Sequence, residues 1–161
     1  MPQATPNTPN TPDTPDTPEA ALQRVVQLFN QLQPSDVARL DQFYCPDAHF
    51  KDPFNEVQGL SEVQRIFDHM YVALHAPRFV VTQAVQQGEH AFVTWDFLFA
   101  LRSQPNTLFT VRGATHFVLR QEQDRWCVAV HRDYWDVAEE LYEKLPVLGS
   151  LMRWLKRRVN S

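Results

Sequence analysis

The sequence of 161 residues has only two cysteines and no long apolar run. Cys45 and Cys127 form no CxxC pair, so we expect two buried, unbonded thiols in a reducing compartment and predict a cytoplasmic protein. No apolar stretch approaches the roughly 20 residues that span a bilayer. The N-terminus also lacks the basic start and apolar core of a secretory signal.

Nucleic-acid, metal and cofactor signatures are also missing. The net charge is −4, which argues against a nucleic-acid-binding surface. GxSxG, P-loop and GxGxxG motifs do not occur, which argues against acyl-hydrolase, nucleotide-binding and Rossmann functions. None of the six histidines has the close spacing of a metal pair on one element. We therefore predict no metal site and no cofactor.

Composition divides the chain into three parts. Residues 1–17 form a Thr/Pro-rich repeat that we expect to be disordered, because proline removes backbone donors and little apolar surface is present. Residues 18–137 have the composition of a folded domain. Residues 138–161 are predicted to form an amphipathic, basic helical extension, in which 147–161 either contact a membrane peripherally or pack on the domain itself.

Apolar periodicity and turn residues predict the elements of the domain. Thr17 and Pro18 begin a helix that ends at Pro34, and Ser35 caps a short second helix. Gly59 and Ser61 begin a third, in which Ser61 and Gln64 fit a capping box. Strands are predicted at 48–52, 78–86, 91–101, 108–120 and 125–135. This order predicts an α+β fold, a cystatin-like cone in which a curved antiparallel sheet wraps around the N-terminal helices, with a ligand pocket at its open end.

Alternation along the strands predicts which side chains share a face. If Asp96 faces the helices, then Phe92, Thr94 and Leu98 do so too, and Trp95 faces outward with its neighbours Val93, Phe97 and Phe99. The outer face would then be strongly apolar and need a cover. A second copy is the simplest cover, so we predict a homodimer through the outer sheet face.

The segment from Tyr44 to Pro53 resembles the start of nuclear transport factor two-like proteins, a superfamily that contains ketosteroid isomerases, SnoaL-like cyclases and limonene epoxide hydrolases. The helix after Gly59, the Trp95–Leu101 strand and residues 131–136 extend the likeness over roughly residues 19 to 137. The resemblance implies the same cone-shaped fold. It does not by itself fix a function.

Two activities of the superfamily can be compared position by position. Asp52 resembles the proton-shuttling base of the ketosteroid isomerases, but Phe29 and Thr115 stand where the resemblance implies oxyanion donors. Asp96 and Asp133 resemble the acid–base pair of the epoxide hydrolases. There, Thr94 stands in place of the bridging arginine, and Phe50 and Asp52 stand in place of the water-holding tyrosine and asparagine. Both likenesses are therefore incomplete.

These comparisons predict that three carboxylates, Asp52, Asp96 and Asp133, meet in an apolar cavity. Crowded carboxylates in such surroundings share protons, so an acid and a base would be present together. The predicted ligand-binding side chains are Phe50, Phe92, Thr94, Leu98, Thr115, Phe117, His131 and Trp135.

Three functions stay open. The site could perform acid–base catalysis of the isomerase, cyclase or hydrolase type on a small hydrophobic molecule. It could instead bind a hydrophobic or lipid-like ligand without catalysis, or the domain could act only through its outer sheet. In the last two cases Asp52 and Asp133 would serve as structural hydrogen-bond partners.

Overall fold

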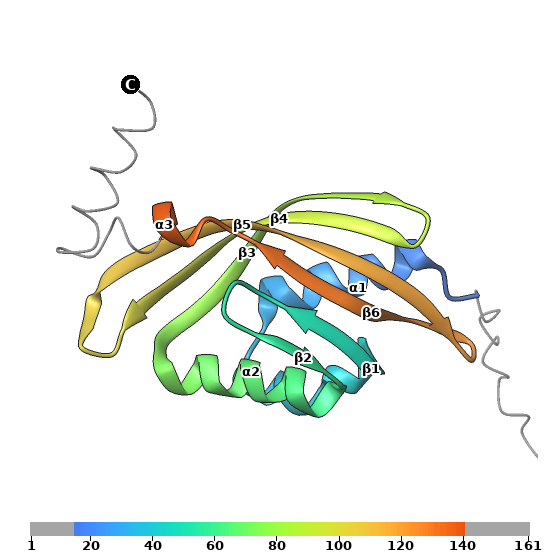
Figure 1. Ribbon diagram of the computed structural model, residues 1–161, viewed down its shortest axis with the longest axis horizontal. Helices are drawn as coiled ribbons and strands as arrows, with labels where there is room; N and C mark the ends of the chain where they lie inside the picture. The colour runs from blue at the N-terminus through green and yellow to red at the C-terminus, as the bar shows by residue number, and fades with distance from the viewer. Residues whose placement is uncertain (1–14, 141–161) are drawn as a thin grey trace, which may run out of the picture.

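A six-stranded sheet arches over two helices in the computed structural model, which describes residues 15–140 (Figure 1). The strand order is β2-β1-β6-β5-β4-β3. The elements are α1 (Pro18–Gln31), the 3-10 helix η1 (Pro34–Gln42), β1 (Tyr44–Lys51), β2 (Glu56–Gln58), α2 (Leu60–Ala73), β3 (Leu74–Gln87), β4 (His90–Leu101), β5 (Gln104–Glu122), β6 (Arg125–Tyr134) and α3 (Val137–Glu140). The predicted α+β cone is confirmed.

Several sequence predictions lie outside the described residues. They are the disorder predicted for residues 1–17, as far as residue 14, the basic helix predicted over 138–161, from residue 141 onward, and the membrane contact through 147–161. Within residues 15–140, no helix is long and apolar enough to cross a membrane.

The start of α1 follows the predicted capping chemistry. The Thr17 hydroxyl oxygen accepts a hydrogen bond from the backbone N–H of Ala20 at 3.1 Å, and Pro18 occupies the first helical position. Ahead of this cap, Asp16 accepts hydrogen bonds from Arg24 and from the backbone N–H of Trp126, both at 2.7 Å. The ordered domain therefore begins before Pro18.

The predicted caps at Ser35 and Ser61 are wrong, whereas the predicted start of the third helix at Gly59 is confirmed. The residue that caps η1 is Gln33 and not Ser35. Its backbone N–H donates a hydrogen bond to the Asp36 carboxylate at 2.9 Å. Helix α2 begins at Leu60, directly after Gly59, so Ser61 lies inside its first turn. Gly59 has a φ of +98°, a conformation that lets the chain turn sharply from β2 into the helix.

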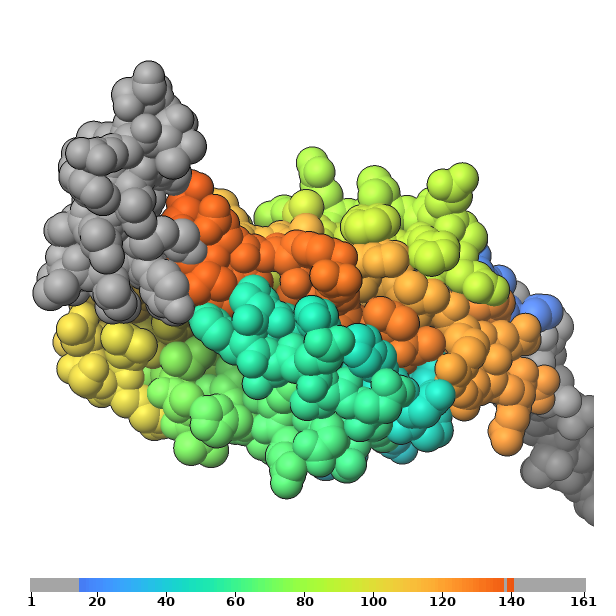
Figure 2. Space-filling model, viewed as in Figure 1, coloured from blue at the N-terminus to red at the C-terminus, as the bar shows by residue number. Residues whose placement is uncertain are grey.

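The sheet is mixed rather than wholly antiparallel. Strands β3 to β6 form the predicted antiparallel meander. Strand β1, however, runs parallel to β6, and the short β2 pairs with β1 at the edge. Figure 2 shows the β1–β2 segment (teal) beside β6 (orange) and over α2 (green). This pairing joins segments far apart in sequence, which local patterns cannot indicate.

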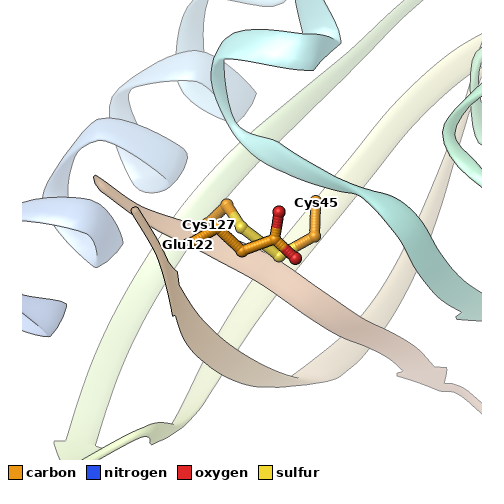
Figure 3. A group of neighbouring side chains, drawn as sticks. All are labelled: Cys45, Glu122 and Cys127. Atoms are coloured by element: carbon orange, nitrogen blue, oxygen red, sulfur yellow. A yellow bond between two sulfur atoms is a disulfide. The ribbon is translucent and has the colours of Figure 1, made fainter. Parts of the chain in front are cut away.

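A disulfide joins Cys45 of β1 to Cys127 of β6, so the prediction of two unbonded thiols is wrong (Figure 3). The two cysteines are 82 residues apart, and only the parallel pairing brings them together. Disulfides are typical of oxidising compartments, so the cysteines no longer support a cytoplasmic protein. Glu122 lies beside them, but because the sulfurs are bonded to each other and Arg120 pairs with Glu122, this group does not form a metal site.

Candidate functional site

A cavity of about 730 Å³ lies between the inner face of the sheet and helices α1 and α2. Its walls are mainly apolar and aromatic. They include Phe29 of α1, Phe67 of α2 and, from the strands, Phe50, Phe79, Trp95 and Phe117. A cavity of this size and character is typical of sites for small ligands.

Buried polar side chains meet on one wall of this cavity. The hydroxyl of Tyr44 lies 2.7 Å from Nδ1 of His131, and Nε2 of His131 lies 2.8 Å from Oδ1 of Asp133. Tyr44 is fully buried, His131 is 3% exposed, and the Asp133 side chain keeps 15% of its surface exposed. The three side chains therefore form a chain of hydrogen bonds that ends on a carboxylate lining the cavity.

Burial determines the direction of these hydrogen bonds. Burial, and secondarily the negative charge of Asp133, raise the pKa of Tyr44 well above its usual 10. Tyr44 therefore keeps its proton, and because Nδ1 of His131 is the only hydrogen-bond partner of this buried hydroxyl among residues 15–140, the hydroxyl donates a hydrogen bond to Nδ1. Nδ1 then accepts, and Nε2 on the other side of the ring donates to Asp133.

A second chain of donors reaches the same carboxylate oxygen. The indole N–H of Trp95 donates to the hydroxyl of Thr115 at 2.8 Å, and this hydroxyl donates to Oδ1 of Asp133 at 2.5 Å. Oδ1 thus accepts from both Thr115 and His131. Among residues 15–140, Oδ2 of Asp133 has no hydrogen-bond donor.

Gly113 gives the Trp95 indole the space to make this bond. It pairs with Trp95 across β4 and β5, and a Cβ atom placed on Gly113 would lie 2.4 Å from the Trp95 ring. Real Cβ contacts are never this short, so any larger residue at position 113 must displace the indole. Gly113 therefore supports the hydrogen bond to Thr115 indirectly.

Five of the eight predicted ligand-binding side chains line the cavity, namely Phe50, Thr115, Phe117, His131 and Trp135. Of the predicted catalytic carboxylates, Asp133 and Asp52 line it as well.

The predicted orientation of β4 is wrong. Asp96, Phe92, Thr94 and Leu98 face away from the cavity, and their neighbours Val93, Trp95, Phe97 and Phe99 line it. Side chains alternate along β4, so the strand must bury one of the two sets and expose the other. The set with Trp95 and Phe97 has more apolar surface, and burying that surface stabilises the observed orientation. Asp96 instead lies 3.9 Å from Arg112 on the outer face, so the acid–base pair of Asp96 and Asp133 does not form.

Asp52 stabilises a turn at the cavity rim. Its Oδ1 accepts from the backbone N–H groups of Phe54 at 2.7 Å and Asn55 at 2.6 Å, and the Asn55 amide donates to both carboxylate oxygens. An aspartate that holds its own turn in this way is a common structural arrangement. We therefore assign Asp52 a structural role.

Residues 25–129 match the SnoaL-like domain family. The chain belongs to this family. The match ends at Ala129, before His131 and Asp133, so these two side chains are placed by the structure alone. No curated protein matches the sequence.

Solved structures share the fold of this SnoaL-like domain. A protein with a ketosteroid isomerase-like fold from Catenulispora acidiphila, in complex with trimethylamine, is 17% identical over 82% of this chain and 92% of its own, with a TM-score of 0.60. A putative SnoaL-like polyketide cyclase from Jannaschia sp. is 14% identical over 81% and 94%, with a TM-score of 0.61. An LEH-like epoxide hydrolase from M. tuberculosis is 17% identical over 90% and 98%, also with a TM-score of 0.61.

The outer sheet face of this SnoaL-like domain differs from the predicted one. Because Trp95 and Phe97 line the cavity, the exposed large apolar side chains on the outer face are fewer and include Val80, Phe92 and Tyr134. The homodimer through this face stays a prediction, with less apolar surface to support it.

Tyr44 and Trp95 are the functional residues that sequence reasoning missed. Tyr44 begins a strand whose pairing with β6 could not be predicted. Trp95 could have been assigned to the cavity, because the alternate set Val93, Trp95, Phe97 and Phe99 is uniformly apolar, whereas Asp96 and Thr94 are polar.

Proposed function

We propose that the cavity binds a small, mainly apolar molecule and that the Asp133 carboxylate accepts a proton from it. The observation that carries this proposal is the unequal bonding of the two carboxylate oxygens. Oδ1 accepts from both Thr115 and His131, and Oδ2 has no donor among the described residues. Because the carboxylate is fixed by two donors, its second oxygen is held ready for a ligand at the cavity wall.

The reaction that fits one fixed carboxylate is proton abstraction beside a carbonyl group. The C–H bond breaks, its proton goes to Oδ2 of Asp133, and its electron pair moves into an enolate. Return of the proton at the same or another carbon completes exchange or isomerisation. Attack by the enolate carbon on a second carbonyl of the same molecule would close a ring, and the proton on Asp133 would then pass to the new alkoxide oxygen. Two-carboxylate hydrolysis is not proposed, because Asp96 lies on the outer face.

Ligand binding without catalysis is the alternative. It is favoured by the hydroxyl of Thr115, which is directed to Asp133 and is therefore not directed to a substrate oxygen. Phe29, which also lines the cavity, has no donor. A developing enolate would find few hydrogen-bond donors on this wall.

The test uses 1-tetralone, a small apolar ketone, as the probe. Wild-type protein in D₂O should accelerate exchange of the α-protons, measured by NMR, by about a hundredfold over buffer. Asp133→Asn should abolish the acceleration. Asp96→Asn is the matched control, because it neutralises a carboxylate of the same sheet on the opposite face, and should retain it.

Ligand binding is measured in parallel by quenching of tryptophan fluorescence, since Trp95 and Trp135 line the cavity. Binding without exchange in the wild type would favour the non-catalytic alternative. Exchange that survives in Asp133→Asn, or the absence of both binding and exchange, would contradict the proposal.

A further inference from the structure

The Cys45–Cys127 disulfide lies close in sequence to the hydrogen-bonded side chains Tyr44 and His131. Each of the two strands that it joins carries one of them. Cys45 directly follows Tyr44 in β1, and Cys127 precedes His131 by four residues in β6. Both cysteines are buried, with exposed fractions of 0% and 1%. Figure 3 shows the bond crossing from one strand to the other.

The ladder between β1 and β6 is interrupted at this place. Tyr44 pairs with Val128, and the regular pairing resumes only at His49 with Val130. The intervening segment contains Pro46, which has no backbone N–H to donate. On its other side, β1 pairs with β2 from His49 onward, and the carbonyls of Asp47 and Ala48 accept from Gln58 and Gly59. These bonds lie beyond Pro46 and do not hold the stretch next to Tyr44.

Tyr44 lies at the end of this weakly paired segment. Its ring stacks on His131, with 6.0 Å between ring centroids, and its hydroxyl makes the 2.7 Å contact with Nδ1. On the side away from the interruption, the backbone N–H of Val128 donates to the carbonyl of Phe43 at 2.8 Å. The disulfide at Cys45 supplies the tie on the other side.

We propose that the Cys45–Cys127 disulfide is a positioning element for the cavity: it holds the Tyr44 hydroxyl on Nδ1 of His131 and so fixes the position of the imidazole whose Nε2–H donates to Asp133. Tyr44 and the disulfide act through His131 and do not touch a substrate. The effect on proton abstraction rests on the proposed function. The effect on His131 does not.

Opening the disulfide should release this constraint. A dithiol reductant transfers two electrons and two protons, so that the S–S bond is replaced by two thiols and the dithiol becomes a cyclic disulfide. The β1 segment around Tyr44 then loses its covalent tie to β6. Without the hydroxyl, Nδ1 of His131 loses its hydrogen-bond donor, and only the contact of Nε2 with Asp133 still orients the ring.

The tautomer of His131 can be measured directly by ¹⁵N NMR of the imidazole nitrogens, with the signal assigned from a His131→Gln spectrum. Wild-type protein should show one neutral tautomer, protonated on Nε2. The double variant Cys45→Ser/Cys127→Ser should lose the hydrogen-bonded chemical shift of Nδ1, which reports the contact with the Tyr44 hydroxyl. Tyr44→Phe, which removes the hydroxyl and keeps the disulfide, should produce the same loss.

Val63→Ala is the control for lost stability, because Val63 is fully buried on α2 and does not line the cavity. It should leave the His131 signature unchanged. A wild-type signature in the folded double variant would overturn the proposal. If the double variant does not fold, folded wild-type protein is treated with dithiothreitol and measured instead. Unfolding of that sample too would overturn the proposal, since the disulfide would then support the whole domain.

A second readout separates this proposal from the proposed function. Exchange of the 1-tetralone α-protons should fall about tenfold in the double variant and in Tyr44→Phe, within the range for a misaligned proton acceptor. An altered His131 signature with no exchange even in the wild type would leave the positioning role intact and contradict only the catalytic proposal.

Discussion

Polar side chains on the inner face of the sheet are buried and hydrogen-bonded to one another, whereas those on the outer face of the same strands are exposed to solvent. On the inner face, Trp95, Thr115 and His131 are at most 6% exposed and their hydrogen bonds converge on Asp133. On the outer face, Asp96 and Arg112 are only 3.9 Å apart and have side chains 39% and 75% exposed. A buried polar group needs a partner, whereas an exposed one can use water. Only the inner face therefore holds a carboxylate in one fixed position.

Aromatic side chains give the largest expected contrast between the two faces. Phe117 is 1% exposed on the inner face and Phe92 is 48% exposed on the outer face. Phe117→Ala should reduce the free energy of unfolding by about 3–5 kcal/mol, and Phe92→Ala should change it by less than about 0.5 kcal/mol. Both values come from urea unfolding.

Equal losses of unfolding free energy in Phe117→Ala and Phe92→Ala would contradict the expected difference between the inner and outer faces. A large loss for Phe92→Ala that grows with protein concentration would instead show that a second copy covers the outer face, because association stabilises the folded state by mass action.

Substitutions at Gly113, on the inner face, and at its neighbour Ala114, on the outer face, should differ by an intermediate amount in their effect on the free energy of unfolding. Gly113→Ala should lower the free energy of unfolding by about 1–3 kcal/mol, because the new methyl group collides with the Trp95 ring. Ala114→Ser, on the opposite face of the same strand, should stay within about 0.5 kcal/mol. Thermal unfolding measures both, and near-UV circular dichroism should change only for Gly113→Ala. An unchanged tryptophan signal in Gly113→Ala would contradict the claim that a side chain at position 113 displaces the Trp95 ring.

The smallest expected effect is a pH dependence from the outer face. His116 stacks on Phe92 with 4.4 Å between ring centroids and lies 3.0 Å from His90. Burial, then the neighbouring charges of His90 and Arg132, lower the pKa of His116 below 6.5. The unfolded chain therefore binds more protons at this residue, and its contribution to stability is lost as the pH falls below 6.5.

His116→Asn removes this titration. The free energy of unfolding, followed by urea titration from pH 8 to pH 5, should fall slightly less steeply in the variant than in the wild type. Parallel curves for the two proteins would show that His116 does not contribute. The inner-face variant Val93→Ala serves as a comparison, because it removes buried apolar surface and no titrating group, and should shift the whole curve without changing its slope.

Local sequence signals located most of the elements but not the orientation of β4. Thr17 and Pro18 marked the start of α1 because a helix cap involves residues within one turn. Alternation located both faces of β4, yet the choice of the face that lines the cavity was wrong. The choice followed the likeness of Asp96 to a catalytic residue, although burial of Trp95 and its apolar neighbours contributes far more free energy.

The sequence by itself determined the α+β cone, the antiparallel meander and the presence of Asp133 and His131 on one strand face, because these follow from local periodicity and turn chemistry. Tertiary structure alone decided the parallel pairing of β1 with β6, and with it the disulfide and the contact between Tyr44 and His131. These contacts join residues more than 80 positions apart, and their energy depends on packing that no local pattern encodes.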